Sequence, residues 1–218
     1  MKQLTSCLAL ALSLALLPSP GRASLFFSEY VEGSSYNKAL EIFNPTTETL
    51  NLADYDINIY YNGGSDPTTY SLEETWLSPG TVAVIAHTSA VDALKSKADF
   101  LLGMSFNGDD AISLIDSDNN NCDVIGQIGH DPGSLWGDEA KGTQDMTLFR
   151  NPEILTGDPD GSDPFLLTEW TALPLNDFSG LGSHEVNAVP LPPAVLLLGT
   201  GLLGVLGVGR VWEKAFFS

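Results

Sequence analysis

Basic residues are scarce in this chain of 218 residues, which has 9 lysines and arginines against 28 acids and a formal net charge of −19. Residues 1–23 contain two of the bases and no acid, so the remainder carries 7 bases against 28 acids, or −21. A field of this sign repels phosphate backbones and argues against nucleic acid as a partner. It fits cations, surfaces bridged by cations, or simple solubility in an exposed setting.

Cysteine is almost absent. The chain has two cysteines, and Cys7 lies in the N-terminal segment. Leu4-Thr-Ser-Cys7 superficially resembles a lipoprotein box, but it precedes the apolar segment instead of following it, which excludes lipidation. Once the N-terminus is removed, Cys122 is the only thiol, so no intramolecular disulfide can form. We expect Cys122 to be inert, because nothing near it in sequence would activate it.

The familiar catalytic motifs are also missing. The sequence contains no HExxH or CxxC zinc motif, no Gly-x-Ser-x-Gly nucleophile turn and no Walker-type lysine loop. The chain is therefore predicted not to be an enzyme and to need no cofactor. Three histidines are expected at strand ends or in loops and not as ligands: His87, His130 and His184.

Glu29 and Glu41 are the two acids that could act as a pair. They lie on neighbouring predicted strands and could pair across them, or each could bind Lys38 at the rim. A hydrolase would use such paired acids, but no third polar group accompanies them. The structural interpretation is therefore preferred.

Short alternating segments dominate what remains. Thirteen prolines, twenty-one glycines and few helical patterns favour strands and turns. Residues 25–31, 39–43, 55–61 and 81–86 have the periodicity or composition of strands, and only residues 91–100 suggest a short helix. Turn signals recur every eight to twelve residues or so, the spacing of an all-β sandwich.

The stretch from Phe106 to Trp136 is predicted to be a β-meander. Asn107-Gly108 favours a tight primed hairpin turn, because both central residues of that turn need positive φ. A strand over 111–116, a polar turn over 116–121 and a return strand over 123–128 follow. Gly126 and Gly129 mark a bulge or a close approach of another backbone.

The N-terminus has the anatomy of a secretory signal peptide over residues 1–23. Lys2 supplies the positive start, Leu8 to Leu17 the apolar segment, and Gly21-Arg22-Ala23 a cleavage site of small residues. Ten apolar residues are too few to cross a bilayer. The mature chain is therefore predicted to be exported and to begin at Ser24.

One loop partly imitates a calcium site. Asp158, Asp160 and Ser162 present oxygen at alternating positions, and Glu169 occupies the twelfth position, as in an EF-hand loop. Asp163 stands where the sharp-turn glycine belongs, so a plain acidic turn is the alternative. The second acidic loop, residues 116–123, poses the same choice.

The C-terminus combines a Pro-rich linker over residues 187–193 with a hydrophobic segment over 194–218. The apolar run reaches Gly209 and, with Val211 and Trp212, approaches the length of a tilted membrane span. Trp212 suits the interface, while Arg210 and Lys214 suit the cytoplasmic side. The alternative, a glycine-rich helix buried in the domain, is weaker because the segment follows the apparent end of the sandwich.

Several motifs in order resemble the bacterial lamin-tail domain. They are FSEYVEGSSYNKALEIFNPT (27–46), NGDDAISLID (107–116), DVIGQIG (123–129), Trp136-Gly137, DMTLFR (145–150), TEW (168–170) and LGSH (181–184). The resemblance covers roughly residues 25–185. It implies an immunoglobulin-like β-sandwich over 24–186, without known catalytic residues, found in secreted bacterial proteins alone or beside enzymes.

The tail resembles the PEP-CTERM sorting signal that exosortases process. The tail differs from that family in Arg210, Glu213 and Lys214, where an arginine cluster is usual; a simple membrane anchor is the alternative. The resemblance implies a Gram-negative envelope protein attached at, or released to, the extracellular polymer matrix. The sorting motif would comprise Val189, Pro190, Leu191, Pro192, Pro193 and Arg210.

Together these features predict a secreted interaction module, sorted or anchored through its C-terminus, that binds an unknown protein or polysaccharide in the surface or biofilm matrix. Two other functions stay open. One is an accessory domain of an extracellular nuclease or phosphoesterase system, and the other is a calcium-dependent adhesin.

Overall fold

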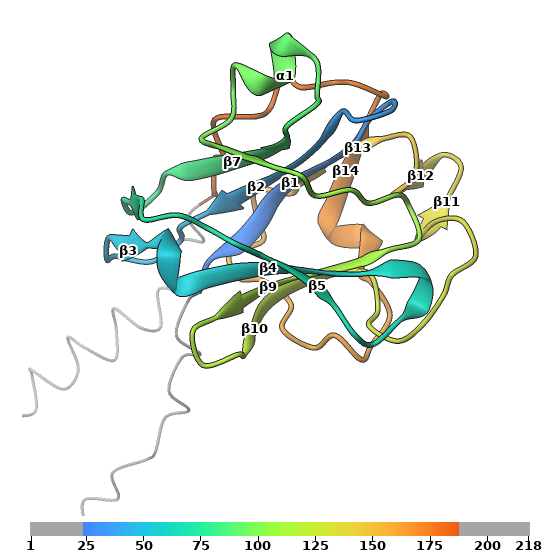
Figure 1. Cartoon of the computed structure of the whole chain (residues 1–218), viewed down its shortest axis with the longest axis horizontal. Helices are drawn as coiled ribbons and strands as arrows, with labels where there is room; N and C mark the ends of the chain where they lie inside the picture. Colours follow the sequence, from blue (N-terminus) through green and yellow to red (C-terminus); the bar gives the residue numbers. More distant parts are fainter. Residues whose placement is uncertain (1–23, 188–218) are drawn as a thin grey trace, which may run out of the picture.

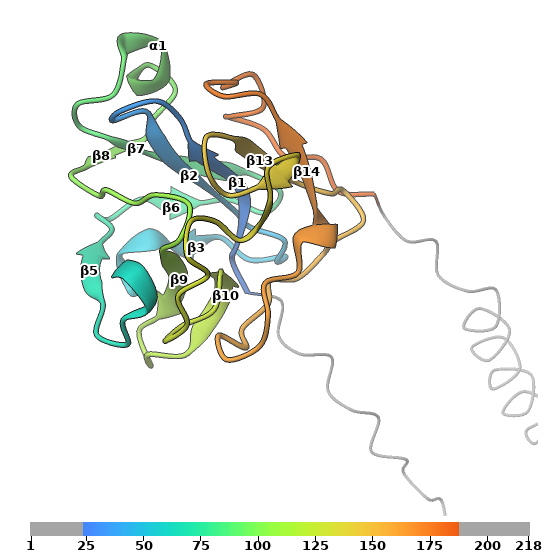
Figure 2. The same ribbon diagram turned by 90° about the vertical axis from the view of Figure 1, so that its right-hand side faces the viewer.

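Two β-sheets face each other in the computed structural model, which describes residues 24–187 (Figures 1 and 2). The larger sheet has the order β14-β13-β1-β2-β7-β8 and the smaller one β10-β9-β4-β5. All strand pairs in both sheets are antiparallel except β7 and β8. The prediction of an all-β sandwich is confirmed.

The strands of the larger sheet are β1 (Phe26–Glu32), β2 (Lys38–Phe43), β7 (Val82–His87), β8 (Phe100–Leu102), β13 (Thr147–Arg150) and β14 (Trp170–Leu173). Those of the smaller sheet are β4 (Tyr55–Tyr60), β5 (Thr68–Ser71), β9 (Ala111–Asp116) and β10 (Asn121–Ile125). Two short ribbons pair β3 (Leu50–Asn51) with β6 (Trp76–Leu77) and β11 (Gly137–Asp138) with β12 (Lys141–Gly142).

Helices are few and short among the described residues, as the sequence predicted. The α-helix α1 (Asp92–Lys95) lies within the segment expected to be helical. The 3-10 turns are η1 (Leu52–Asp54), η2 (Tyr61–Gly63) and η3 (Leu167–Glu169). Over residues 24–187 none of the helices is long and apolar enough to cross a membrane. The predicted signal peptide and the segments 188–193 and 194–218 lie outside the described residues.

The main core lies between the sheets, because alternate residues of each strand point inward. Leu40, Ile42 and Ile85 come from the larger sheet, and Ile57 and Leu114 come from the smaller one. All five side chains have no exposed surface. A second cluster covers the opposite, outer face of the larger sheet and contains Val31, Ala39, Val84, Ala86, Ala90, Leu94 and Leu181.

The prediction of a hairpin turn at Asn107-Gly108 is wrong. Neither residue has positive φ, and β8 and β9 on either side belong to different sheets. The Asp110 carboxylate accepts the Asn107 N–H at 3.0 Å and forms the turn instead. Gly108 is required for another reason: an added Cβ would lie 2.8 Å from the Gln144 Cα.

The prediction that Gly126 marks a close approach is confirmed. An added Cβ there would lie 2.7 Å from Nε1 of Trp136, and the backbone has φ of +88°. Gly129 also has positive φ, but the space beside it is open. The hairpin of β9 and β10 forms as expected, although the return strand ends at Ile125.

A buried ion pair joins the two sheets. Arg150 of β13 donates to Asp123 of β10 through Nη1 at 2.8 Å and Nη2 at 3.3 Å. Neither side chain is more than 1 % exposed. The same carboxylate accepts the N–H of Phe27 at 2.8 Å and that of Asp158 at 2.7 Å. These donors compensate the carboxylate for the hydration that it loses on burial.

A bulge in β1 makes the Phe27 contact possible. The register of β1 against β2 shifts between Phe27 and Glu29, so the ladder is locally interrupted. The Arg150 guanidinium also lies over the rings of Trp170 and Phe26, 4.5 and 5.4 Å from their centroids. These cation–π contacts complete the burial of the charge.

We expect Arg150→Met to lower the free energy of unfolding by about 3–5 kcal/mol, because it leaves the Asp123 charge buried without its cation. Denaturant unfolding at neutral pH measures the change. Lys95→Met is the control: it removes the exposed contact of Lys95 with Asp92 at 3.0 Å and should cost at most about 1 kcal/mol. Equal losses in the two variants would contradict the structural role of the buried pair.

Candidate binding site

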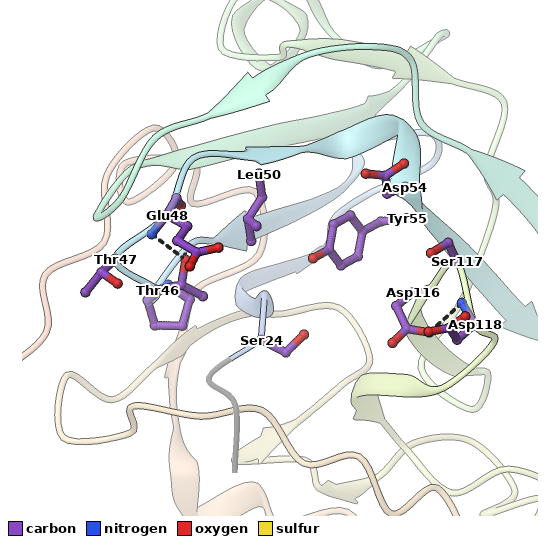
Figure 3. A pocket seen from close by; sticks show the side chains of 11 residues that line it. Ser24, Thr46, Thr47, Glu48, Leu50, Asp54, Tyr55, Asp116, Ser117 and Asp118 are labelled. Atoms are coloured by element: carbon purple, nitrogen blue, oxygen red, sulfur yellow. Dashed lines mark hydrogen bonds between the residues drawn. The ribbon is translucent and has the colours of Figure 1, made fainter. Parts of the chain in front are cut away.

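A cavity of about 570 Å³ opens at the end of the sandwich where the described chain begins (Figure 3). Four segments form its wall: Ser24, the loop 45–50, the start of β4 and the turn between β9 and β10. The lining residues are Ser24, Pro45, Thr46, Thr47, Glu48, Leu50, Asp54, Tyr55, Asp116, Ser117 and Asp118.

One buried side chain shapes the loop 45–50. Asn44, which has no exposed surface, donates from Nδ2 to the carbonyls of Glu48 and Leu77, both at 2.9 Å. Its Oδ1 accepts the Thr46 N–H at 3.0 Å and the Thr46 hydroxyl at 2.7 Å. Asparagine favours such local turns because its amide can replace backbone partners. The loop is therefore held by the residue that precedes it.

The opposite wall is the turn between β9 and β10. The Asp116 carboxylate accepts the N–H groups of Asp118 and Asn120 at 3.0 and 2.9 Å. Slight burial acts to raise the Asp116 pKa, but the donors of Asn120 and Asp118 outweigh it and hold this pKa below its ordinary value. This carboxyl is therefore ionised at neutral pH.

Strand register brings the two walls together. Tyr55, the first residue of β4, lies directly opposite Asp116 of β9. In Figure 3 the Tyr55 ring lies between Leu50 and Asp116, and Asp54 lies on the side of Asp116. The cavity thus presents a half-buried aromatic ring, several hydroxyls and four carboxylates, with no lysine, arginine or histidine in its lining.

This lining offers several groups that can bind a polar ligand. Carboxylates accept hydrogen bonds, hydroxyls both donate and accept, and an aromatic ring offers an apolar face. A polar, uncharged or cationic ligand fits this chemistry.

The four predicted calcium ligands lie in one region, but their oxygens have other partners. Asp158 Oδ1 accepts the Asp160 N–H at 3.1 Å, and Asp160 Oδ1 accepts the Ser162 hydroxyl at 2.6 Å. Glu169 lies 3.3 Å from Nη2 of Arg150. Within residues 24–187, no three acidic, histidine or cysteine side chains are grouped so that they could hold a metal ion.

In the second acidic loop, Asp116 closes the turn and Asp123 carries the buried ion pair. The sorting motif (Val189, Pro190, Leu191, Pro192, Pro193 and Arg210) lies outside the described residues.

Two of the histidines are buried against aromatic rings. His87 ends β7 and stacks on Tyr36 at 4.7 Å between centroids. Burial and then the nearby Lys38 lower its pKa. His184 lies among Phe26, Phe43 and Phe149. His130 is an exposed loop residue.

The acids predicted to pair across strands do face each other. Glu29 and Glu41 are directly opposite in β1 and β2, and neither has any exposed surface. Lys38 binds Glu32 instead. Cys122 is buried, and burial raises the pKa of its thiol, in keeping with an inert cysteine.

Sequence reasoning did not identify the cavity. The sequence predicts the turn over 116–121 and a strand that begins at Tyr55, but as separate features. The signal that could have joined them is the pairing of Tyr55 with Asp116, which depends on the register between two distant strands.

A family model described as Lamin Tail Domain matches residues 18–129, just over half of the chain. No curated protein matches the chain. The described sheets extend past that match, since β13 and β14 follow Gly129 and complete the larger sheet.

Proposed function

The chain belongs to the lamin tail domain family, and on that premise we propose that it is a non-catalytic interaction module of the cell envelope or extracellular matrix of a Gram-negative bacterium. The family is an immunoglobulin-like one without catalytic activity. Folds of this kind carry binding sites on loops at the ends of the sheets, so function has to be argued from those loops.

The cavity at the end of the sandwich is the observation that carries the proposal. Its volume of about 570 Å³ falls within the range of small-ligand sites, roughly 300–1,000 Å³. Two walls are held by side-chain hydrogen bonds from Asn44 and to Asp116, so the site is preformed. A preformed site binds without the cost of ordering its loops.

Polysaccharide is the ligand class that this lining favours. Sugar hydroxyls donate well to carboxylates such as Asp54 and Asp118, and the apolar face of a sugar ring packs on an aromatic side chain such as Tyr55. The strongly negative chain would select neutral or amine-bearing polymers over anionic ones.

The variant Asp54→Arg tests the cavity. The arginine side chain would fill the space and pair with the carboxylates around it, so we expect binding to neutral or amine-bearing polysaccharides to weaken by tenfold or more. Titration against a panel of soluble polysaccharides measures this. Asp66→Arg is the matched control, because it makes the same charge change in an exposed loop next to β5, at the far end of β4.

Binding that falls equally in both variants would show that net charge and not the cavity is responsible. No binding of the unchanged protein to any polymer in the panel would remove the polysaccharide assignment.

Attachment through the C-terminus is the second part of the proposal. Asn187 is the last described residue, and its N–H donates to the Pro152 carbonyl at 2.8 Å. The strands of both described sheets lie between Phe26 and Leu173, which supports the assignment of residues 188–218 as a sorting signal or an anchor. An exosortase-type enzyme or the membrane itself would be its partner, and residues 1–23 would direct export.

We expect a chain that ends at Asn187 to appear in the medium as a folded protein with an unchanged thermal midpoint, because it keeps every contact of the described sheets. Fractionation of cells that produce the full and the shortened chain, followed by thermal unfolding, measures this. Retention of the shortened chain in the envelope, or its aggregation, would contradict C-terminal anchoring.

A further inference from the structure

The last described segment crosses the outer face of the larger sheet. We name residues 174–187, which follow β14, the C-terminal strap (Figures 1 and 2). At one end, Oδ1 of Asn176 accepts the Ser34 N–H and the Nδ2 of Asn37, both at 3.0 Å. In the middle, the Gly182 N–H donates to Oε2 of Glu41 at 2.6 Å.

Apolar contacts complete the docking of the strap. Leu181 packs in the outer cluster with Val84 and Leu94. His184 covers Phe26 and Phe43, with ring centroids 5.8 and 4.9 Å away. Without the strap, this face of the sheet would expose large apolar side chains to water.

One buried side chain beneath the strap has no partner. Glu29 has no exposed surface, and neither of its carboxylate oxygens makes a hydrogen bond. The backbone of the strap presses directly on it, since a Cβ added at Gly180 would overlap Oε2. A buried carboxylate without a donor or a cation is strongly disfavoured in the ionised form.

Taken together, the charged groups around Glu29 also disfavour its ionised form. Glu41 faces it from β2 and Asp177 faces it from the strap, while Lys97, which follows α1, opposes them. Burial first, and then Glu41 and Asp177, raise the Glu29 pKa to about 8. Lys97, whose Nζ donates to the Leu181 carbonyl at 2.8 Å, lowers this pKa less than burial, Glu41 and Asp177 raise it.

Glu41 differs from Glu29 because it has donors. Burial raises its pKa, but the Ser28 hydroxyl, at 2.6 Å, and the N–H groups of Gly182 and Ser183 favour its ionised form. Glu29 is therefore the group of the pair whose ionisation the closed strap does not accommodate.

We propose that the C-terminal strap is a pH-sensitive latch, which stays docked while the buried Glu29 carboxyl is neutral and opens from the sheet when that carboxyl ionises. Opening would expose the outer face of the larger sheet. It would also loosen the connection between the sandwich and the chain that follows Asn187. A shallow hollow lined by Lys97, Asp177 and Phe178 lies beside the strap and gives water access to its edge.

The direction in which pH shifts the equilibrium between the closed and the open strap follows from proton binding. An open strap leaves Glu29 solvated, with a pKa near the ordinary 4.5, so only the closed form keeps the proton between pH 4.5 and 8. Closure is thus fully favoured below pH 4.5, weakens as pH rises to 8, and is constant above 8.

His184 has the opposite effect over part of this range. Burial and then the nearby Arg150 lower its pKa to about 4 from 6.5, so its contribution to closure is full above pH 6.5 and is lost as pH falls toward 4. The two effects offset each other between pH 4.5 and 6.5. The net opening is therefore expected between pH 6.5 and 8.

Hydrogen exchange of the full-length protein tests the latch. We expect the opening constant of the Gly182 amide, corrected for intrinsic exchange, to rise about tenfold per pH unit between pH 6.5 and 8 and then to level off. In Glu29→Gln, which keeps the shape of the neutral acid, this rise should disappear. The opening constant should instead fall between pH 4.5 and 6.5, because the open form holds the His184 proton more tightly than the closed form.

Glu73→Gln is the matched control, because Glu73 is exposed and distant in the fold, and it should behave like the unchanged protein. Asp177→Asn is a second variant, whose side-chain oxygen can still accept the Ser179 N–H. It removes a charge that raises the Glu29 pKa, so the opening constant should level off below pH 8.

A flat profile between pH 6.5 and 8 in the unchanged protein would overturn the latch, as would the same rise in Glu29→Gln. If Glu29→Gln does not fold, an Asp177→Asn profile identical to the unchanged one would overturn it. These outcomes do not depend on polysaccharide binding, because no residue of the strap lines the cavity.

Discussion

The contact between Arg150 and Asp123 is the constraint on which the sandwich depends. It connects β13 of the larger sheet to β10 of the smaller one, and the same carboxylate holds the bulge in β1 through the Phe27 N–H. Removal of either charge would leave the other in a space without water. The sheets can therefore separate only if the whole site opens, which makes their relative position specific as well as stable.

The two buried acids Asp123, in the smaller sheet, and Glu29, in the larger sheet, have opposite properties. Burial raises the pKa of Asp123, but its cation and several N–H donors oppose that rise and favour the ionised form. Glu29 has no donor, so its neutral form is the one that fits. The first site fixes the sheets to each other, and the second makes the cover of the outer face responsive to protons. Neither acid lines the binding cavity, which keeps its shape through Asn44 and Asp116.

Alternation of apolar and polar residues was enough to predict the strands. The segment that became β4 and the hairpin of β9 and β10 are examples, because their inward side chains recur with period two. The prediction failed at Asn107-Gly108, where dipeptide preference was outweighed by a chain crossing between sheets and by the Asp110 carboxylate. Local sequence does not report such long-range contacts.

The functional groups were harder to predict for the same reason. The sequence predicts only that Asp123 begins a strand, and its role appears when Arg150, 27 residues away, is brought beside it. Glu29 and Glu41 were recognised as possible partners, but their complete burial depends on the strap around residue 180. Tyr55 and Asp116 are joined only by strand register. In each case the missing information is tertiary and not local.

The most direct measurement of the central constraint is native-state hydrogen exchange at the amides of Phe27 and Asp158, whose N–H groups donate to the Asp123 carboxylate. If the ion pair joins the sheets, both amides should exchange only through global unfolding, with the same free energy as the slowest amides of the core. Exchange of either amide by local opening, at a free energy well below that of global unfolding, would contradict the account.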